Sequence, residues 1–323
     1  MKNPLTIHLL IKDNEQTIQK AIASLALLNA NILVADLGSK DRSAYLSQKN
    51  AKVIRLSLNE DYSNVRNYLV SKSETDWQMY LEPWEILAGG HEHILKAISG
   101  GSMAYMMQCV QGDIITKQIR LWHRDLKLKF SNPVYESLVY SSAQNLGVPI
   151  LIENIDRSEE TLKIIETWIV KHPLAIEPYY YQACTLLSQR RWVDFIGVAD
   201  YYLFREKTAL IPLTLLRYYY GWVKCHIFKE PLLAIKHVTS CLAVRPLMAE
   251  FWCLLGDIYY LQKEYEEALE FYDNAMILGS RRLKTDDWPM EITKYRDYPQ
   301  KMHNACKQML TNTSTIAVSP NFI

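Results

Sequence analysis

The chain has 323 residues, of which 49% are hydrophobic and 22% are charged, so it has the size of about two domains and the composition of an ordinary globular protein. Its formal net charge of +1 gives no electrostatic basis for binding nucleic acid or an anionic membrane. No apolar run reaches the ~18 residues that cross a bilayer, and the N-terminus lacks the features of a signal peptide, so we expect a cytoplasmic protein without a membrane span.

The first 155 residues alternate short apolar runs with helical patterns, which is typical of βαβ units around a parallel sheet. The predicted strands cover 6–11, 30–38, 51–57 and 76–82, and the predicted helices cover 14–28, 41–50 and 64–73. Residues 102–153 are rich in β-forming side chains with short turns, so we expect additional, partly antiparallel strands there. The sequence therefore predicts a Rossmann-like α/β domain with a mostly parallel sheet over residues 1–155.

After Arg157 the pattern is helical almost throughout, and residues 246–278 contain a repeat signature. Its characteristic side chains are Trp252, Leu255, Gly256, Tyr259, Ala268, Tyr272 and Ala275. This resembles the tetratricopeptide repeat, in which two helices approach each other at small residues. Weaker units near residues 218 and 176, and a closing helix within 286–311, would complete an all-α solenoid over 156–310. Residues 311–323 are expected to form a flexible tail.

Tyrosines are frequent in this helical half, at 179–181, 201–202, 218–220 and 259–260. A solenoid presents a concave surface on which such side chains could bind an extended peptide. Aromatic residues at helical spacing more often pack between helices, so we expect most of these tyrosines in the core and a minority in a groove.

Four motifs in the first domain, in their order and spacing, resemble those of family 2 glycosyltransferases of the GT-A fold. They are Asn14-Glu15 after the first strand, the D-x-G-S-x-D turn at 36–41, the Arg66-Asn67 pair before a strand with an acidic end, and Tyr135-Glu136. The resemblance covers residues 4–155. The combination with tetratricopeptide repeats is similar to bacterial members that glycosylate bacteriocin peptides on cysteine, of the sublancin S-glycosyltransferase type.

The resemblance implies that a nucleotide sugar, with UDP as the nucleotide, binds at the carboxyl edge of the sheet. Asp36 would accept hydrogen bonds from the uracil or ribose, and Gly38 would let the turn pass close to the ligand. Arg66 would contact the base or a phosphate. Asn14, Glu15 and Asn67 complete the implied nucleotide-binding set, and open α/β sheets do bind ligands outside the carboxyl ends of their strands.

Each of these residues also has a plain structural interpretation. Asp36 could cap the turn before the following helix. Glu15 could be a first-turn acid near the positive end of a helix dipole, and Arg66 could be a solvated helix residue. The motif order favours the ligand-binding interpretation for all three.

The acidic turn at Glu82-Pro83-Trp84-Glu85 departs from the D-x-D motif of the family, whose two aspartates hold Mg²⁺ or Mn²⁺ on the diphosphate. Glu82 replaces the first aspartate and Trp84 the second. Glu82 and Glu85 are therefore the predicted metal ligands for a divalent cation. His91 and His93 could be drawn in, although the first turn of an exposed helix is the simpler interpretation for them.

Three functions remain open after these observations, of which the weakest is a protein whose first domain is only a platform for peptide-binding repeats. The first is an inverting transferase in which Glu136 deprotonates a peptide, protein or other acceptor positioned by the repeats. The second is a glycosyltransferase-like protein that has lost its chemistry and binds a nucleotide sugar or a partner protein. The replacement of the second aspartate by Trp84 is the observation that favours the second.

Overall fold

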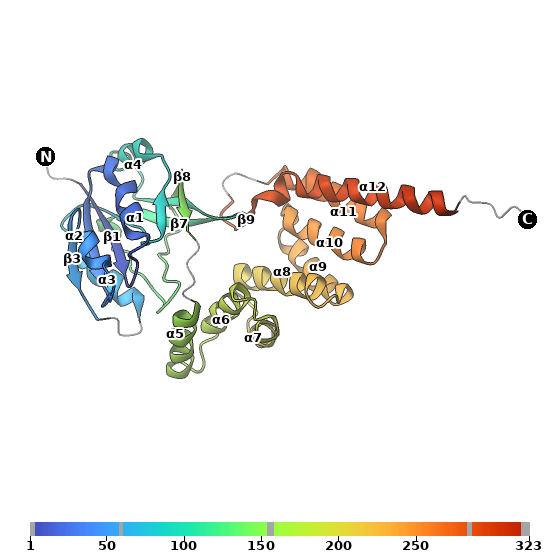
Figure 1. The fold of residues 1–323 in the computed structure, drawn as a ribbon, viewed down its shortest axis with the longest axis horizontal. Helices are drawn as coiled ribbons and strands as arrows, with labels where there is room; N and C mark the ends of the chain where they lie inside the picture. The colour runs from blue at the N-terminus through green and yellow to red at the C-terminus, as the bar shows by residue number, and fades with distance from the viewer. Residues whose placement is uncertain (1–3, 58–60, 154–157, 283–285, 318–323) are drawn as a thin grey trace, which may run out of the picture. The chain divides into compact units, whose positions relative to one another are not determined.

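The computed structural model describes residues 4–57, 61–153, 158–282 and 286–317. The chain divides into two compact units, Met1–Lys171 and His172–Ile323 (Figure 1). The predicted class is confirmed, because the first unit is α/β and the second is almost entirely helical. The division of contacts falls after Lys171 and groups the helix at 158–171 with the first unit, whereas the sequence predicts a boundary at 155/156.

A single mixed sheet organises the first unit, and its strands lie in the order β3-β2-β1-β4-β7-β6-β8-β5. The strands are β1 (Leu5–Ile11), β2 (Asn31–Asp36), β3 (Lys52–Arg55), β4 (Trp77–Tyr80), β5 (Glu85–Leu87), β6 (Ala104–Gln111), β7 (Ile114–His123) and β8 (Gln144–Ile152). The first four strands of the sequence are parallel, whereas β7 is antiparallel to β4 and β6. The carboxyl ends of β1 to β4 consequently share one edge of the sheet.

Helices cover both faces of the parallel strands, as expected for βαβ units. The helices of this unit are α1 (Ile18–Ser24), α2 (Ser43–Gln48), α3 (Tyr62–Lys72), α4 (His91–Ala97) and α5 (Ser158–Lys171). Strand β1 is buried along its whole length. Its residues Ile7 and Leu9 pack with Ile18 of α1, whereas Leu10 packs with Leu69 of α3. The hydrophobic runs of the strands thus fix the sheet between two helical layers.

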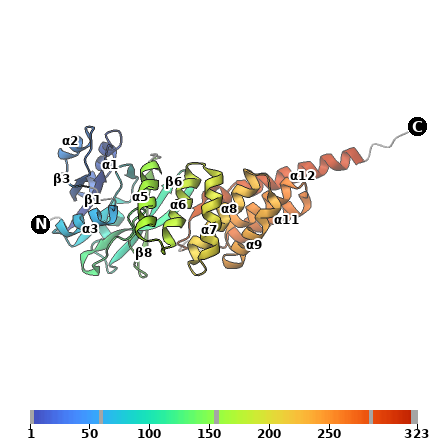
Figure 2. The same ribbon diagram turned by 90° about the horizontal axis from the view of Figure 1, so that it is seen from below.

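The second unit is a succession of helices that pack pairwise in chain order (Figure 2). They are α6 (Glu177–Ser188), α7 (Trp192–Arg205), α8 (Leu210–His226), α9 (Pro231–Val244), α10 (Ala249–Leu261), α11 (Tyr265–Gly279) and α12 (Tyr298–Ala317). A Cβ atom added to Gly256 of α10 would lie 2.6 Å from the ring of Tyr272 in α11. The small residue is therefore required where these two helices cross, as the repeat signature predicts.

The tyrosines of this unit serve mainly in packing. Among those singled out in the sequence, only Tyr201 is exposed, while Tyr202, Tyr218 and Tyr220 are buried and the others half-buried. Helix α12 runs through residues 311–317, the first part of the segment indicated as a tail. Among the residues that the structure describes, no helix is long and apolar enough to cross a membrane.

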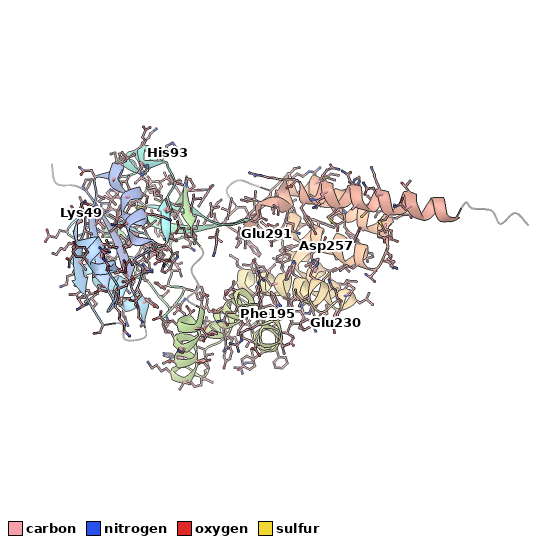
Figure 3. All side chains as sticks on the ribbon, viewed as in Figure 1. Lys49, His93, Phe195, Glu230, Asp257 and Glu291 are labelled. Atoms are coloured by element: carbon pink, nitrogen blue, oxygen red, sulfur yellow. The ribbon has the colours of Figure 1, made fainter. Side chains whose placement is uncertain are left out.

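Residues 286–297, before α12, lie along one face of α10 instead of forming the start of a closing helix. The backbone amide of Glu291, in the short strand β9 (Met290–Glu291), donates to Glu250 over 2.9 Å, and the Tyr295 hydroxyl donates to Glu250 over 2.5 Å. The Tyr298 hydroxyl donates to Asp257 over 2.7 Å. Figure 3 labels Asp257 and Glu291 among the side chains of this unit. The closing helix predicted within 286–311 therefore begins only at Tyr298. The buried Glu250 carboxylate holds the preceding residues against α10.

The buried Glu250 should make the stability of the second unit depend on pH. Burial raises its pKa to about 7, although the hydrogen bonds from Tyr295 and Glu291 and the charge of Arg282 act in the opposite direction. An acid whose pKa is higher in the folded state favours folding at low pH. We expect the free energy of unfolding to fall by on the order of 3 kcal/mol as the pH rises from about 4.5 to about 7.

Urea unfolding followed by helical circular dichroism at about pH 5 and about pH 8 measures this dependence. Glu250→Gln should remove most of it, and Glu266→Gln, at an exposed position on α11, should leave it intact. An unchanged dependence in Glu250→Gln would assign it to other groups.

Candidate functional site

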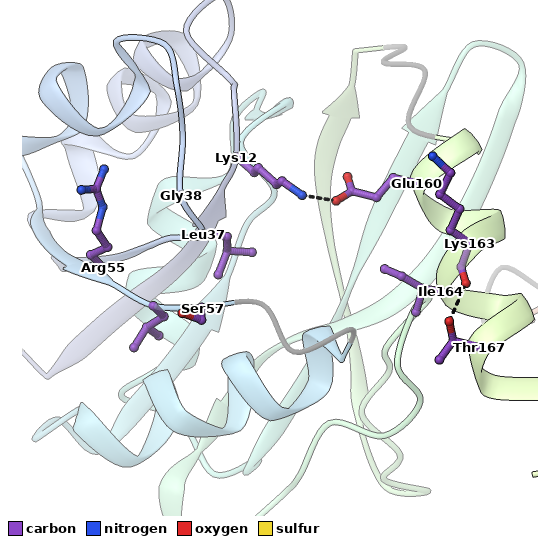
Figure 4. Close-up of a pocket in the computed structure, with 10 residues that line it drawn as sticks. Lys12, Leu37, Gly38, Arg55, Ser57, Glu160, Lys163, Ile164 and Thr167 are labelled. Carbon is purple, nitrogen blue, oxygen red and sulfur yellow. Dashed lines mark hydrogen bonds and ion pairs between the residues drawn. The ribbon is translucent and has the colours of Figure 1, made fainter. Parts of the chain in front are cut away.

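A cavity of about 620 Å³ lies at the carboxyl ends of β1, β2 and β3 (Figure 4). Its lining comes from the three loops after these strands and from one face of α5: Lys12, Leu37, Gly38, Arg55, Leu56, Ser57, Glu160, Lys163, Ile164 and Thr167. Open α/β sheets bind ligands at this edge. Gly38 is the one residue of the predicted nucleotide-binding set that lines the cavity.

Gly38 has a backbone φ of +89°, in the left-handed region that favours glycine, and a Cβ atom placed there would meet no atom within 4 Å. Asp36, at the end of β2, stabilises the same turn. Its carboxylate accepts from the Ser39 amide over 2.8 Å and pairs with Arg55 over 3.2 Å. Burial tends to raise the pKa of Asp36, but the Ser39 hydrogen bonds and Arg55 hold it below its usual value. Asp36 thus caps the turn and keeps an ionised carboxylate beneath the cavity.

Asn14 and Glu15 tie the loop after β1 to the loop after β2. The Asn14 side-chain oxygen accepts from the Lys12 backbone amide over 2.8 Å, and the Asn14 backbone amide donates to the Ser43 hydroxyl over 2.6 Å. Glu15 accepts from the Arg42 amide over 3.1 Å. These contacts make both residues part of the framework that fixes Lys12 at the cavity wall.

A second group of predicted residues meets around Arg66, which α3 places beside the carboxyl end of β4. The Arg66 guanidinium donates from Nε to Glu136 over 2.5 Å and pairs through Nη2 with Glu82. Its centre lies 4.9 Å from the ring centroid of Tyr80 and 5.5 Å from that of Phe130. With 4% of its side chain exposed, Arg66 is not a solvated helix residue. Burial opposes its charge, but Glu82 and Glu136 raise its pKa.

One nitrogen of Arg66, Nη1, is buried and has no hydrogen-bond partner within the described ranges. A buried donor without a partner is costly and marks a place where a bound group could accept a hydrogen bond. The interpretation of Arg66 as a ligand-binding residue is compatible with this arrangement.

Asn67 holds the loop that carries Glu136. Its side-chain amide donates to the Phe130 carbonyl over 3.0 Å, and its side-chain oxygen accepts from the Phe130 amide over 2.9 Å. Tyr135 precedes Glu136 with a φ of +51°. Burial raises the pKa of Glu136, although Arg66 acts against this. Asn67 is therefore a positioning residue in this structure, and Glu136 is a buried carboxylate held by an arginine.

Glu85 pairs with an arginine that the sequence analysis did not single out. Arg120 of β7 donates to both Glu85 oxygens, over 2.8 and 2.7 Å, and its guanidinium lies 4.1 Å from the Tyr80 ring centroid. Glu85 also accepts from the Glu82 amide over 2.9 Å. A single arginine within the apolar run IRLW was the available signal, because a buried strand tolerates such a charge only when it is paired.

The acidic turn in this arrangement does not fit a divalent cation. Arg66 binds the Glu82 carboxylate, and Arg120 binds both oxygens of Glu85. Trp84 offers no metal ligand, and the described residues contain no group of three His, Cys, Asp or Glu side chains that could hold a metal ion. His91 begins α4, where its ring bonds the Ser24 carbonyl over 2.7 Å.

Sequence comparison with known proteins identifies the tetratricopeptide repeat of the second unit. The family model of the tetratricopeptide repeat matches residues 249–279, which confirms the predicted repeat. No curated protein matches the chain at a significant level.

Among solved structures, MamA 41-end from Desulfovibrio magneticus RS-1 is 20% identical with a TM-score of 0.35, over 51% of this chain and 88% of that one. S. aureus TarS 1-349 in complex with UDP-GlcNAc is 9% identical with a TM-score of 0.37, over 93% of this chain and 92% of that one. At these identities and TM-scores the likenesses carry no functional argument.

Proposed function

We propose that the chain is an inverting glycosyltransferase of the family 2 type, with a GT-A domain in the first unit. The observation that carries the proposal is the cavity at the carboxyl ends of three neighbouring parallel strands, with Gly38 in its wall. A nucleotide sugar with UDP as carrier is the proposed donor. The acceptor is a peptide, protein or other molecule that the repeats position.

The second supporting feature is the buried carboxylate of Glu136 in the cluster after β4. In the proposed reaction, the acceptor attacks the anomeric carbon while the bond to the diphosphate oxygen breaks, and the acceptor proton passes to Glu136. Because burial raises the pKa of Glu136, it would be a stronger base than an exposed glutamate. Arg66 must release this carboxylate during the reaction, since the two groups are paired.

The cavity can be tested by calorimetric titration with UDP and UDP-GlcNAc. Gly38→Val is expected to weaken binding at least about tenfold, because a branched side chain would enter the cavity from its wall. Gly112→Val is the matched control, since Gly112 also has a positive φ of +56° and no atom within 4 Å of its added Cβ, and it does not line the cavity. Equal losses in both variants would point to backbone strain and contradict the proposed site.

A second candidate function is binding of the nucleotide sugar without transfer. The pairing of Glu82, Glu85 and Glu136 with arginines favours it, because each of these carboxylates is already engaged. Turnover separates the two candidates. UDP release that is abolished by Glu136→Gln, with UDP binding retained, supports the transferase, whereas binding without release supports the second candidate.

A further inference from the structure

The cavity contains an excess of positive charge. Three cationic side chains line it, Lys12, Arg55 and Lys163, against the single carboxylate of Glu160. Glu160 and Lys163 lie three residues apart on α5, so they share the helix face that closes the cavity. Such a lining suits an anionic ligand.

Each cation is engaged to a different degree. Lys12 pairs with Glu160 across the cavity, and their side chains are 34% and 30% exposed (Figure 4). Arg55 pairs with Asp36 but leaves 74% of its side chain exposed. In the part of the chain that the structure describes, no carboxylate pairs with the Lys163 ammonium. Glu160 therefore occupies the place at Lys12 that a ligand anion could take.

The acidic turn differs from the cavity, because its carboxylates are already paired. Its two glutamates, Glu82 and Glu85, are paired with Arg66 and Arg120. A cation could reach those carboxylates only by breaking buried ion pairs. The positive charge that a diphosphate requires is present instead on side chains of the cavity. A lysine ammonium can act on a phosphate as a point charge.

We propose that Lys12 and Lys163 bind the diphosphate of the donor directly, so that the chain holds its nucleotide without a divalent cation. Glu160 is the internal anion that the phosphate displaces from Lys12. Helix α5 is thus part of the donor site, although the sequence assigns it to the repeats. The proposal rests on the proposed function, since it concerns the same ligand.

Titration with UDP in EDTA and in Mn²⁺ tests the cation requirement. Equal dissociation constants, within about threefold, are expected in the two buffers. Binding that needs Mn²⁺ would overturn the inference and leave the proposed function intact. Absence of UDP binding in both buffers would contradict the proposed function itself.

Variants of α5 test the exchange at Lys12. Glu160→Gln should tighten UDP binding about twofold to fivefold, because it removes the competing anion of a partly exposed ion pair. Lys163→Gln should weaken binding about tenfold, the loss of one charge-assisted contact. Glu166→Gln, exposed on the same helix and outside the cavity, is the control and should change nothing. Equal affinities of Glu160→Gln and Glu166→Gln, or weaker binding by Glu160→Gln, would overturn the proposed exchange.

Discussion

Replacing Arg66 by methionine is expected to lower the free energy of unfolding of the first unit by about 3–5 kcal/mol. The guanidinium is 4% exposed and pairs with both Glu82 and Glu136, which are themselves largely buried. Methionine would retain much of the packing against Tyr80 but would leave two carboxylates in a poorly hydrated environment. Their uncompensated charge, rather than a lost contact, is the main cost.

Urea unfolding of the variant and the parent chain measures this loss. Arg42→Met is the matched control, because Arg42 is an exposed arginine that lies 3.8 Å from Glu15, and it should cost less than about 1 kcal/mol. Adding Glu82→Gln and Glu136→Gln to Arg66→Met should recover most of the stability, since the buried charges are then gone. A loss below about 1 kcal/mol for Arg66→Met would mean that Glu82 and Glu136 are not held as ions by Arg66.

The sheet could be predicted from the sequence because each strand and helix leaves its own pattern of apolar residues in a short stretch of the chain. Apolar runs that alternate with helical patterns indicate parallel strands, and the carboxyl ends of such strands meet at one edge. Gly38, which follows one of these strands, lines the cavity at that edge. The charged partners were not predictable, because Arg66 meets Glu136, and Arg120 meets Glu85, only through the tertiary fold.

The tertiary position of helix α5 could not be predicted from the sequence either. Its helical pattern was visible, and its position before the repeats suggested that it leads them. Its Glu160 and Lys163 instead line the cavity of the first unit. No local pattern distinguishes an amphipathic helix that lines a cavity of the first unit from one that begins the repeats.

In the second unit, the signature around Gly256 predicted the helix crossing with α11 because the small residue is required by direct contact. The 34-residue period of the tetratricopeptide repeat predicts Trp222 as the position equivalent to Gly256 in the preceding helix pair. The residue at that crossing is Gly221, whose added Cβ would lie 3.1 Å from Val238. The repeat length therefore varies by one residue, which only the packing reveals.

Replacing Arg120 by methionine is the second change expected to cost about 3–5 kcal/mol, because it leaves Glu85 buried without its partner. Both side chains are almost fully buried, and Arg120 donates to both oxygens of Glu85. The loss should appear as a lower urea midpoint for the first unit. Glu85→Gln in the same chain should restore much of the stability, since a neutral amide is less costly to bury than a carboxylate.

The dependence of this loss on pH identifies its cause. Burial raises the pKa of Glu85, and Arg120 is the main group that opposes this. Without Arg120 the carboxylate should take up a proton more readily in the folded state, so folding is favoured as the pH falls. The cost of Arg120→Met should therefore be smaller at about pH 5 than at about pH 8. A cost that does not change with pH would assign it to lost packing of Arg120 on Tyr80, 4.1 Å from its guanidinium, instead of to the charge of Glu85.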